Sequence, residues 1–412
     1  MMASNGSARG GPGGRAVANR GGRASAAPGK ATASKRSTGQ NGKAADADAE
    51  SAVATLNLRG RPESKEQLIE FYRQMVLIRR FEEKTGEMYT RAKIGGYCHL
   101  NLGEEATIVG VMSALEPRDY IFTNYREHGY VLARGIDPNR IMAELFGKET
   151  GVSKGRGGSM HLFDAEAHFM GGYAIVGGQL PPATGAGLAI SHRGGDEVVL
   201  CQMGDATTNI GAWHESLNIA QLWKLPVVYL IVNNQFGMGT SVEKGSAVPE
   251  LYKKACAFDM HAERVDGNDL LAVRDAALRA VEIARKEKRP SVLETISFRQ
   301  RGHSVVDPDR YRPRELVEQG RSRDPIPAFG RALLEAELLD GNGLKRIDAQ
   351  VDRMVERSVA FADESPDPQP KDLYVFDYAT EVPNIDRTLP GDHTGLADSS
   401  SGRSDDAGSG GR

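Results

Sequence analysis

Residues 198–234 read VVLCQMGDATTNIGAWHESLNIAQLWKLPVVYLIVNN, and this stretch decides the fold class. Its two ends, 198–203 and 227–232, are apolar runs with the length of a buried strand. Between them, residues 210–222 carry apolar side chains at helical spacing, and Pro226 interrupts that pattern. The apolar helical positions are Trp213, Leu217, Ala220 and Leu222. A strand, a helix and a second strand in this order predict a right-handed βαβ unit with parallel strands.

Polar residues follow each of the two strands. Gly204-Asp205 comes after the first strand and Asn233-Asn234 after the second. Because parallel strands end at the same edge of a sheet, and ligands bind at that edge, these residues are predicted to share a site. A carboxylate and an amide oxygen suit Mg²⁺, and the start of the helix near Asn209 would favour a diphosphate. Alone the pattern is weak, since turn residues commonly follow strands.

The remaining body repeats the alternation of helices and strands. Ser64 and Gln67 form a capping box that opens a helix, and residues 267–288 predict another helix before a strand at 291–298. The apolar positions of these two helices are Leu68, Phe71, Tyr72, Met75 and Ile78, and Leu270, Val273, Ala277, Val281 and Ala284. The predicted fold is α/β, a parallel sheet with helices on both faces.

Composition divides the 412 residues into three segments. Residues 1–55 are rich in Gly, Ala, Ser and basic residues, and 386–412 in Gly, Ser and Asp, so both are predicted to be disordered tails around one domain at 56–385. The net charge of -3 indicates neither a nucleic-acid nor a membrane partner. No apolar run approaches the roughly 20 residues of a membrane helix.

The basic first segment allows two interpretations, a plain bacterial tail or a mitochondrial transit peptide. A transit peptide needs an amphipathic helix, and the glycines of this segment oppose helix formation. The three cysteines are far apart and form no C-x-x-C, which fits a reducing compartment. We therefore expect a location in the bacterial cytoplasm, with the mitochondrial matrix as the alternative.

Six blocks of sequence, in order between residues 64 and 385, carry a specific resemblance. They are GYCHL at 96–100 with GEEA at 103–106, YREHG at 125–129, GRGGSMH at 155–161, GD at 204–205 with LWKLP at 222–226, NNQFGMGTS at 233–241, and RGHS at 301–304. Together they resemble the alpha subunits of thiamine-diphosphate-dependent pyruvate dehydrogenases, the first component of the 2-oxo acid dehydrogenase complexes, of the bacterial type. The resemblance implies a thiamine diphosphate-binding fold.

Three positions depart from the family pattern. Ala206 replaces the third glycine of the G-D-G motif, and it is tolerated if its φ is negative, because alanine adds only a methyl group. Ala174 stands where the family commonly has glycine. Phe236 stands where many members have tyrosine, and this exchange should be harmless because the family uses the backbone carbonyl of that residue.

The resemblance implies a role for each matching residue. It implies metal ligation by Asp205, Asn234 and the Phe236 carbonyl. It implies cofactor binding by Tyr125, Arg126, Ala174, Val176, Asp205, Ala206, Thr207, Asn234, Met238 and His303. His99 and His303 match active-site histidines. In isolation, Arg126 would be read as a surface charge and Met238 as a core residue. His128 fits a loop anchor or a site residue equally, and His161 fits a structural role.

The implied activity is oxidative decarboxylation of pyruvate with transfer of the acetyl group to a lipoyl domain. The implied cofactors are thiamine diphosphate and Mg²⁺, which supply the chemistry while the protein binds and orients. The implied partners are a beta subunit, in an α₂β₂ assembly, and the lipoyl domain of an acyltransferase. The beta subunit would supply the carboxylate that contacts the pyrimidine ring.

Other functions remain open at this stage. Branched-chain 2-oxo acid dehydrogenase and acetoin dehydrogenase alpha subunits are alternatives within the enzyme class. A cofactor-binding regulatory subunit without activity is the alternative of another class, and Ala206 is the residue that suggests it.

In mitochondrial relatives, the serine that matches Ser304 is a phosphorylation site.

Overall fold

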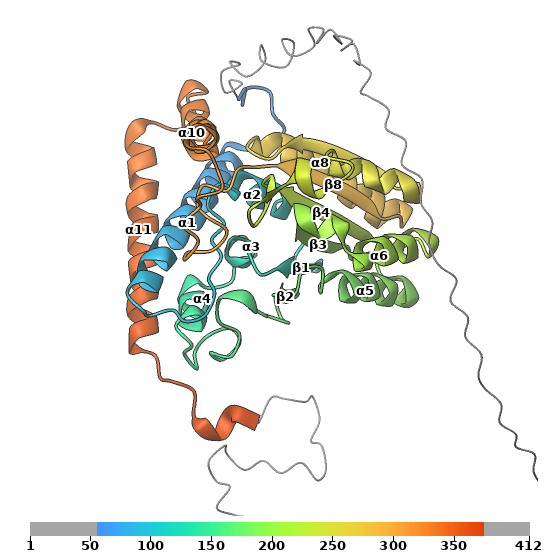
Figure 1. Cartoon of the computed structure of the whole chain (residues 1–412). Coiled ribbons are helices and arrows are strands. Elements are labelled where there is room, and N and C mark those ends of the chain that lie inside the picture. The colour runs from blue at the N-terminus through green and yellow to red at the C-terminus, as the bar shows by residue number, and fades with distance from the viewer. Residues whose placement is uncertain (1–55, 375–412) are drawn as a thin grey trace, which may run out of the picture. The chain divides into compact units, whose positions relative to one another are not determined.

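The computed structural model describes residues 56–374, and the two predicted tails and residues 375–385 of the predicted domain lie outside this range. Six parallel strands form one sheet in the order β2-β1-β3-β4-β8-β7 (Figure 1). The strands are β1 (Tyr120–Asn124), β2 (Phe169–Tyr173), β3 (Val199–Gly204), β4 (Val227–Asn233), β7 (His261–Asp266) and β8 (Ser291–Ile296). β5 (Phe236–Gly237) and β6 (Thr240–Ser241) form a separate antiparallel pair.

The helices surround this sheet, which confirms the predicted α/β class. They are α1 (Lys65–Thr90), α2 (Glu105–Met112), α3 (His128–Ala133), α4 (Pro138–Leu145), α5 (Leu180–Arg193), α6 (Gly211–Leu222), α7 (Val242–Gly245), α8 (Leu270–Glu282), α9 (Arg314–Ser322), α10 (Pro325–Glu335) and α11 (Gly341–Glu364). Within residues 56–374, no helix is long and apolar enough to cross a membrane.

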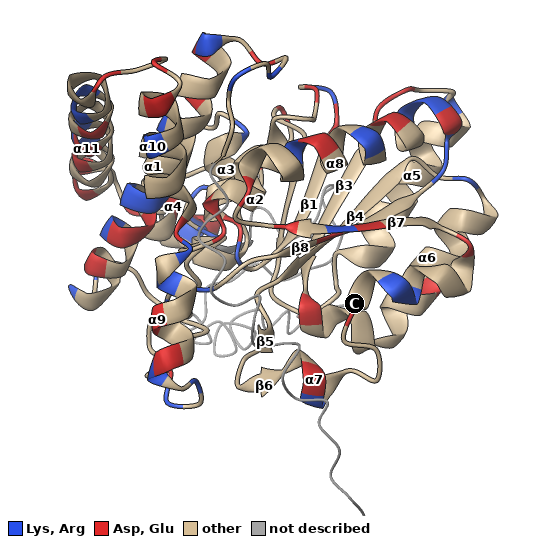
Figure 2. Ribbon diagram, turned by 90° about the horizontal axis from the view of Figure 1, so that it is seen from above, with Lys and Arg blue, Asp and Glu red and all other residues tan. Residues whose placement is uncertain are grey.

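The central strands are buried on both faces. Because successive strand residues point to opposite sides, Leu200 packs with the helices α1, α2 and α8, whereas its neighbours Val199 and Cys201 pack with α5 and α6. β1, β3 and β4 contain no charged residue, and charged side chains are spread over α8 and α11 (Figure 2). This double burial explains the continuous apolar runs of the sequence.

The predicted βαβ unit is confirmed, with one correction. β3 pairs with β4 in parallel, with Leu200 opposite Val228. The helix predicted at 210–222 begins at Gly211, directly after a 3₁₀ turn, Asp205–Asn209. Leu222, predicted on the apolar face, is 69% exposed, because it is the last residue of α6 and lies beyond the packed part of the helix.

The other predicted elements form with shorter bounds. The capping box of Ser64 and Gln67 opens α1, and the predicted apolar stripe of that helix is buried. The helix predicted at 267–288 begins at Leu270, because the Asp269 side chain caps it, and it passes into a π-helical turn at Ile283–Glu287. The strand predicted at 291–298 ends at Ile296.

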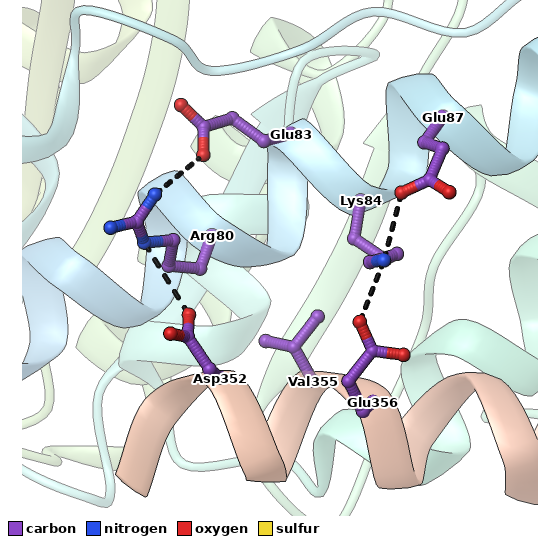
Figure 3. Close-up of a pocket in the computed structure, with 7 residues that line it drawn as sticks. All are labelled: Arg80, Glu83, Lys84, Glu87, Asp352, Val355 and Glu356. Carbon is purple, nitrogen blue, oxygen red and sulfur yellow. Dashed lines mark hydrogen bonds and ion pairs between the residues drawn. The ribbon is translucent and has the colours of Figure 1, made fainter. Parts of the chain in front are cut away.

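α11 is fixed to α1 by packing and by a ladder of ion pairs. Figure 3 shows Arg80 of α1 between Glu83 and Asp352, at 3.2 and 3.5 Å, and Lys84 in the same way between Glu87 and Glu356. These groups are mostly exposed, so the pairs contribute little energy. The buried α11 residues Ile347, Val351 and Val355 contribute the larger share. The charged groove between α1 and α11 is therefore part of a helix–helix interface, and it lies away from the strand ends (Figure 1).

The order of the strands places a switch point between β1 and β3. After β1 the chain places β2 on one side of it. β3 then lies on the other side of β1, and β4, β8 and β7 follow β3 in the sheet on that side. The connections that leave the carboxyl ends of β1 and β3 therefore diverge, which opens a crevice where ligands of open α/β sheets bind.

A buried carboxylate shapes the glycine-rich turn that leads toward β2. Glu144, near the end of α4, accepts four backbone N–H bonds of 2.7–3.1 Å, from Ser153, Gly155, Gly157 and Gly158. Gly155 has φ +76°, and a Cβ there would lie 2.5 Å from a backbone oxygen. An ionised acceptor is the strongest partner for such a set of donors.

Glu144→Gln should destabilise the chain by about 3 kcal/mol, because the amide turns an N–H group toward backbone donors. Urea unfolding followed by circular dichroism measures the change. Glu149→Gln, at an exposed position in the loop after α4, is the control and should change stability by less than about 0.5 kcal/mol. Equal stability of the two variants would show that the turn does not depend on this carboxylate.

Candidate functional site

The loops that follow five strands supply the predicted site residues. Ala174 and Val176 follow β2, Tyr125 and Arg126 follow β1, Asp205, Ala206 and Thr207 follow β3, Asn234, Phe236 and Met238 follow β4, and His303 follows β8. His99 comes from the loop between α1 and α2. All five strands end at the same edge of the sheet, so the structure gathers residues that are up to 204 positions apart in the sequence.

Three aromatic rings form one side of the site. The His99 ring lies 4.4 Å from the Tyr125 ring and 5.0 Å from the His303 ring, measured between centroids. Burial, together with Arg126 nearby, lowers the pKa of His99 to about 2 and that of His303 to about 4. Both imidazoles are therefore neutral near pH 7. Within residues 56–374, neither Nδ1 atom has a hydrogen-bond partner, so both can bind a ligand.

Arg126 links this ring cluster to the loop after β8. The residue is 4% exposed, and its guanidinium donates to the Leu100 carbonyl at 2.6 Å and to the His303 carbonyl at 2.7 Å. The surface-charge interpretation of Arg126 is therefore wrong. Its charge lies beside His99 and His303, where it suits an anionic ligand.

Asp205 opens the turn between β3 and α6. Its side chain is buried, and burial raises its pKa to about 6. Ala206 lies in the same 3₁₀ turn without a left-handed φ, so the condition for tolerating alanine is met. A Cβ on Gly237 would lie 2.7 Å from Ala206 Cβ, which shows that the loop after β4 passes directly over this turn and needs glycine there. Thr207 is buried within the turn.

The side-chain amide of Asn234 is held by a buried carboxylate. Asn234 Nδ2 donates to Glu104 at 3.0 Å, and Glu104 accepts a second bond of 3.0 Å from Asn101. Because the nitrogen is fixed on Glu104, the Oδ1 atom of Asn234 is directed to the opposite side. Glu104 was noted in the sequence only as part of the GEEA block, since nothing in its local pattern relates it to a residue 130 positions away.

The sequence favours the basic residues of the loop after β8, Arg299 among them, as neighbours of an anionic ligand, but it predicts no individual role for Arg299, which the structure places inside the site. Arg299 is 1% exposed, and its guanidinium donates to the Phe236 carbonyl at 3.1 Å and to Asn234 Oδ1 at 3.4 Å. It also contacts the Tyr311 hydroxyl at 2.8 Å, and Tyr311 donates to Asp307 at 2.7 Å. The signal available in the sequence was its place, three residues after a strand whose loop contains His303.

Apolar side chains stay exposed around this edge. Met238 is 64% exposed and has φ +53°, so the core interpretation of this residue is wrong. Ile175 is 78% exposed and Val176 is 42% exposed, next to the half-buried Ala174. Ala174 and Val176 lie near the Asp205 turn, because a Cβ on Gly177 would meet the Ile210 side chain at 1.9 Å.

Two other histidines of the motifs hold loops. His128 is fully buried, with Nδ1 2.9 Å from Glu82 and Nε2 2.9 Å from the Ser159 hydroxyl, which makes it a loop anchor. His161 contacts the Gly172 carbonyl through Nδ1 at 2.9 Å and has the expected structural role.

Residues 73–371 match the family model described as Dehydrogenase E1 component. The chain is 45% identical to the pyruvate dehydrogenase E1 component subunit alpha of Rhizobium meliloti (strain 1021) over 312 residues, covering 76% of this chain and 90% of that protein. The chain belongs to the dehydrogenase E1 component family.

Further relatives carry the same name. The Zymomonas mobilis protein is 44% identical over 314 residues, covering 75% of this chain and 88% of that protein. The Rickettsia bellii protein is 40% identical over 314 residues, covering 76% and 96%. Membership of the dehydrogenase E1 component family implies dependence on thiamine diphosphate. The buried Arg126, the glycine-lined turn at Asp205 and the imidazole nitrogens of His99 and His303, which have no partner among the described residues, fit that ligand.

The low pKa of His99 should appear in the pH dependence of stability. The unfolded chain binds a proton at His99 below about pH 6.5, whereas the folded chain does not, so stability is present above that pH and is lost as the pH falls. Lowering the pH from 7 to 5 should cost about 2 kcal/mol through this residue. We expect His99→Gln to lose less stability than the wild type over that interval in urea unfolding.

His192→Gln is the control, because His192 is exposed at the end of α5. It should lose as much stability as the wild type between pH 7 and pH 5. If His99→Gln and the wild type lose the same free energy, His99 is protonated in the folded chain.

Proposed function

We propose that this chain is the alpha subunit of a pyruvate dehydrogenase, which decarboxylates pyruvate oxidatively and transfers the acetyl group to a lipoyl group. The observation that carries the proposal is the convergence of Tyr125, Arg126, Asp205, Asn234 and His303 at one sheet edge, in a chain whose similar relatives are named pyruvate dehydrogenase E1 alpha subunits. Thiamine diphosphate, when bound, supplies the electron sink for loss of CO₂.

Mg²⁺ is the metal that we propose for this site. Asp205, Asn234 Oδ1 and the Phe236 carbonyl are oxygen donors, the kind that Mg²⁺ prefers, and they leave positions for phosphate oxygens and water. Among residues 56–374, no group of three or more His, Cys, Asp or Glu side chains could hold a metal. The proposed set does not need such a group, because only one of its three donors is a carboxylate.

Arg126, His303 and Tyr125 are the residues that would bind the diphosphate, with Thr207 and Ala206 in the turn next to Asp205. Ala174 and Val176 would border the aminopyrimidine ring, and the exposed Met238 would support the bent cofactor. His99 would face the reacting carbon, and its neutral imidazole can accept or donate a hydrogen bond there.

The site needs a second chain in this proposal. The exposed Ile175 and Val176 follow β2 and the exposed Met238 follows β4, at the edge that holds the site, and exposed apolar groups at such a place are typical of a surface that another protein covers. A beta subunit in an α₂β₂ assembly would cover them and supply the carboxylate for the pyrimidine ring. The lipoyl domain of an acyltransferase would then approach the covered site to receive the acetyl group.

The other enzyme functions and the regulatory function have less support. The similar relatives named above are all called pyruvate dehydrogenase, rather than branched-chain or acetoin dehydrogenase. Ala206 was the residue that suggested an inactive subunit, and because its backbone conformation is one that alanine adopts without strain, it gives no support to that function. The location that we propose is the bacterial cytoplasm, on the glycine content of residues 1–55 and the three free cysteines.

Asp205→Ala should abolish Mg²⁺-dependent binding of thiamine diphosphate without unfolding the chain, because the residue lies at a strand end and holds no ion pair within residues 56–374. Calorimetric titration measures the binding, and thermal unfolding checks the fold. Asp352→Ala removes an exposed carboxylate of α11 as the control and should bind like the wild type. Unchanged cofactor affinity in Asp205→Ala would refute the metal assignment.

The chain should be inactive alone and active after co-expression with its beta subunit. The reason is the carboxylate for the pyrimidine ring, which in this proposal the second chain provides. Pyruvate-dependent release of CO₂, measured for the purified chain and for the co-expressed assembly, tests this. Full activity of the single chain, or an assembly that prefers a branched-chain 2-oxo acid, would contradict the proposed function.

A further inference from the structure

Arg299 uses the same oxygens that the metal needs. Its Nη1 atom lies 3.1 Å from the Phe236 carbonyl oxygen and 3.4 Å from Asn234 Oδ1. These are two of the three oxygens assigned above to Mg²⁺. The side chain has little freedom to avoid them, because it is 99% buried and Nη2 is held by the Tyr311 hydroxyl at 2.8 Å.

The charge of Arg299 is not balanced by a direct ion pair. Within residues 56–374, no carboxylate oxygen lies within 4.0 Å of its guanidinium nitrogens, and its acceptors are backbone carbonyls, an amide and a hydroxyl. The neighbouring Arg312, in contrast, is paired with Asp309. Asp205, Glu104 and Asp307 interact with Arg299 only at longer range. A buried cation without a direct counter-ion is unfavourable, so an added anion would stabilise Arg299 and a second cation would destabilise it.

Distance makes this opposition strong. Mg²⁺ binds oxygen at roughly 2.0–2.1 Å, so an ion on the Phe236 carbonyl would lie within about 5 Å of Arg299 Nη1. At such a separation inside a protein, the electrostatic repulsion between the guanidinium and the metal ion is strong enough to weaken the binding of the ion severely. Either the guanidinium withdraws or the anionic diphosphate must enter with the ion.

We propose that Arg299 couples the binding of the divalent cation to that of the diphosphate, by opposing the cation when it enters alone. The inference rests on the proposed function, because it uses the proposed metal ligands. The buried carboxylates beside the site belong to Asp205 and Glu104. They are matched by the charges of Arg126 and Arg299, so none is left for the ion, whereas the diphosphate supplies the negative charge that the ion needs. The chain thereby favours loading of metal and cofactor together over metal alone.

The experiment is a titration of the full-length chain with Mn²⁺, followed by electron paramagnetic resonance, with and without thiamine diphosphate. In the wild type, thiamine diphosphate should tighten Mn²⁺ binding by at least about fivefold. Arg299→Gln should bind Mn²⁺ alone at least about fivefold more tightly than the wild type and should show a smaller effect of thiamine diphosphate. Arg299→Met, which also removes the charge, should behave in the same way.

Two further variants separate charge from general damage. Arg299→Lys keeps a cation and should retain the wild-type coupling. Arg310→Gln removes an exposed charge of the same loop and should bind Mn²⁺ like the wild type.

The inference is overturned if, without thiamine diphosphate, Arg299→Gln and Arg299→Met bind Mn²⁺ as weakly as the wild type or more weakly. Arg299 would then help to hold the metal-binding oxygens in place rather than oppose the ion. A wild-type chain that binds neither Mn²⁺ nor thiamine diphosphate, also with its beta subunit, would instead refute the proposed function.

Discussion

The parallel sheet is the constraint on which the rest of the molecule depends. β1, β3 and β4 contain no charged residue and are covered by helices on both faces. A parallel sheet buried in this way needs crossover helices, and those crossovers return every strand in the same direction. The carboxyl ends therefore meet at one edge, and polar groups that cannot enter the sheet collect there.

Buried charges then organise that edge. Glu144 binds four backbone N–H groups of the glycine-rich turn, Glu104 holds two amides, and Arg126 holds two carbonyls. Each charge is hydrogen-bonded, which is the condition under which burial of a charge is tolerated, and Glu104 and Arg126 also connect segments far apart in the sequence. Such contacts fix loops that have no regular structure of their own, and so position the side chains of the site.

The charges of the site also have a functional meaning. His99 and His303 are kept neutral, while the positive charges of Arg126 and Arg299 lie close to the buried carboxylates of Asp205 and Glu104. Because the two guanidinium groups already match these carboxylates, the site suits a ligand that brings its own negative charge, and exposed apolar side chains follow β2 and β4 at the same edge. A diphosphate cofactor would explain the arrangement of charges, and a second chain that covers the site would explain the exposed apolar side chains.

The amino-acid sequence determined the class of the fold, because double burial of parallel strands requires continuous apolar runs, and such runs at 198–203 and 227–232 are visible without any structure. It also located Asp205 and Asn234, since strand ends can be read from where those runs stop. The bounds of α6 were predicted to within one residue, whereas those of α8 were less predictable, because capping by Asp269 and the π-helical turn at Ile283–Glu287 depend on local hydrogen bonds. Only the tertiary structure decided the roles of Glu104 and Arg299. Their contacts span 130 and 65 positions of sequence, and the folding of the sheet, rather than any local pattern, brings these partners together.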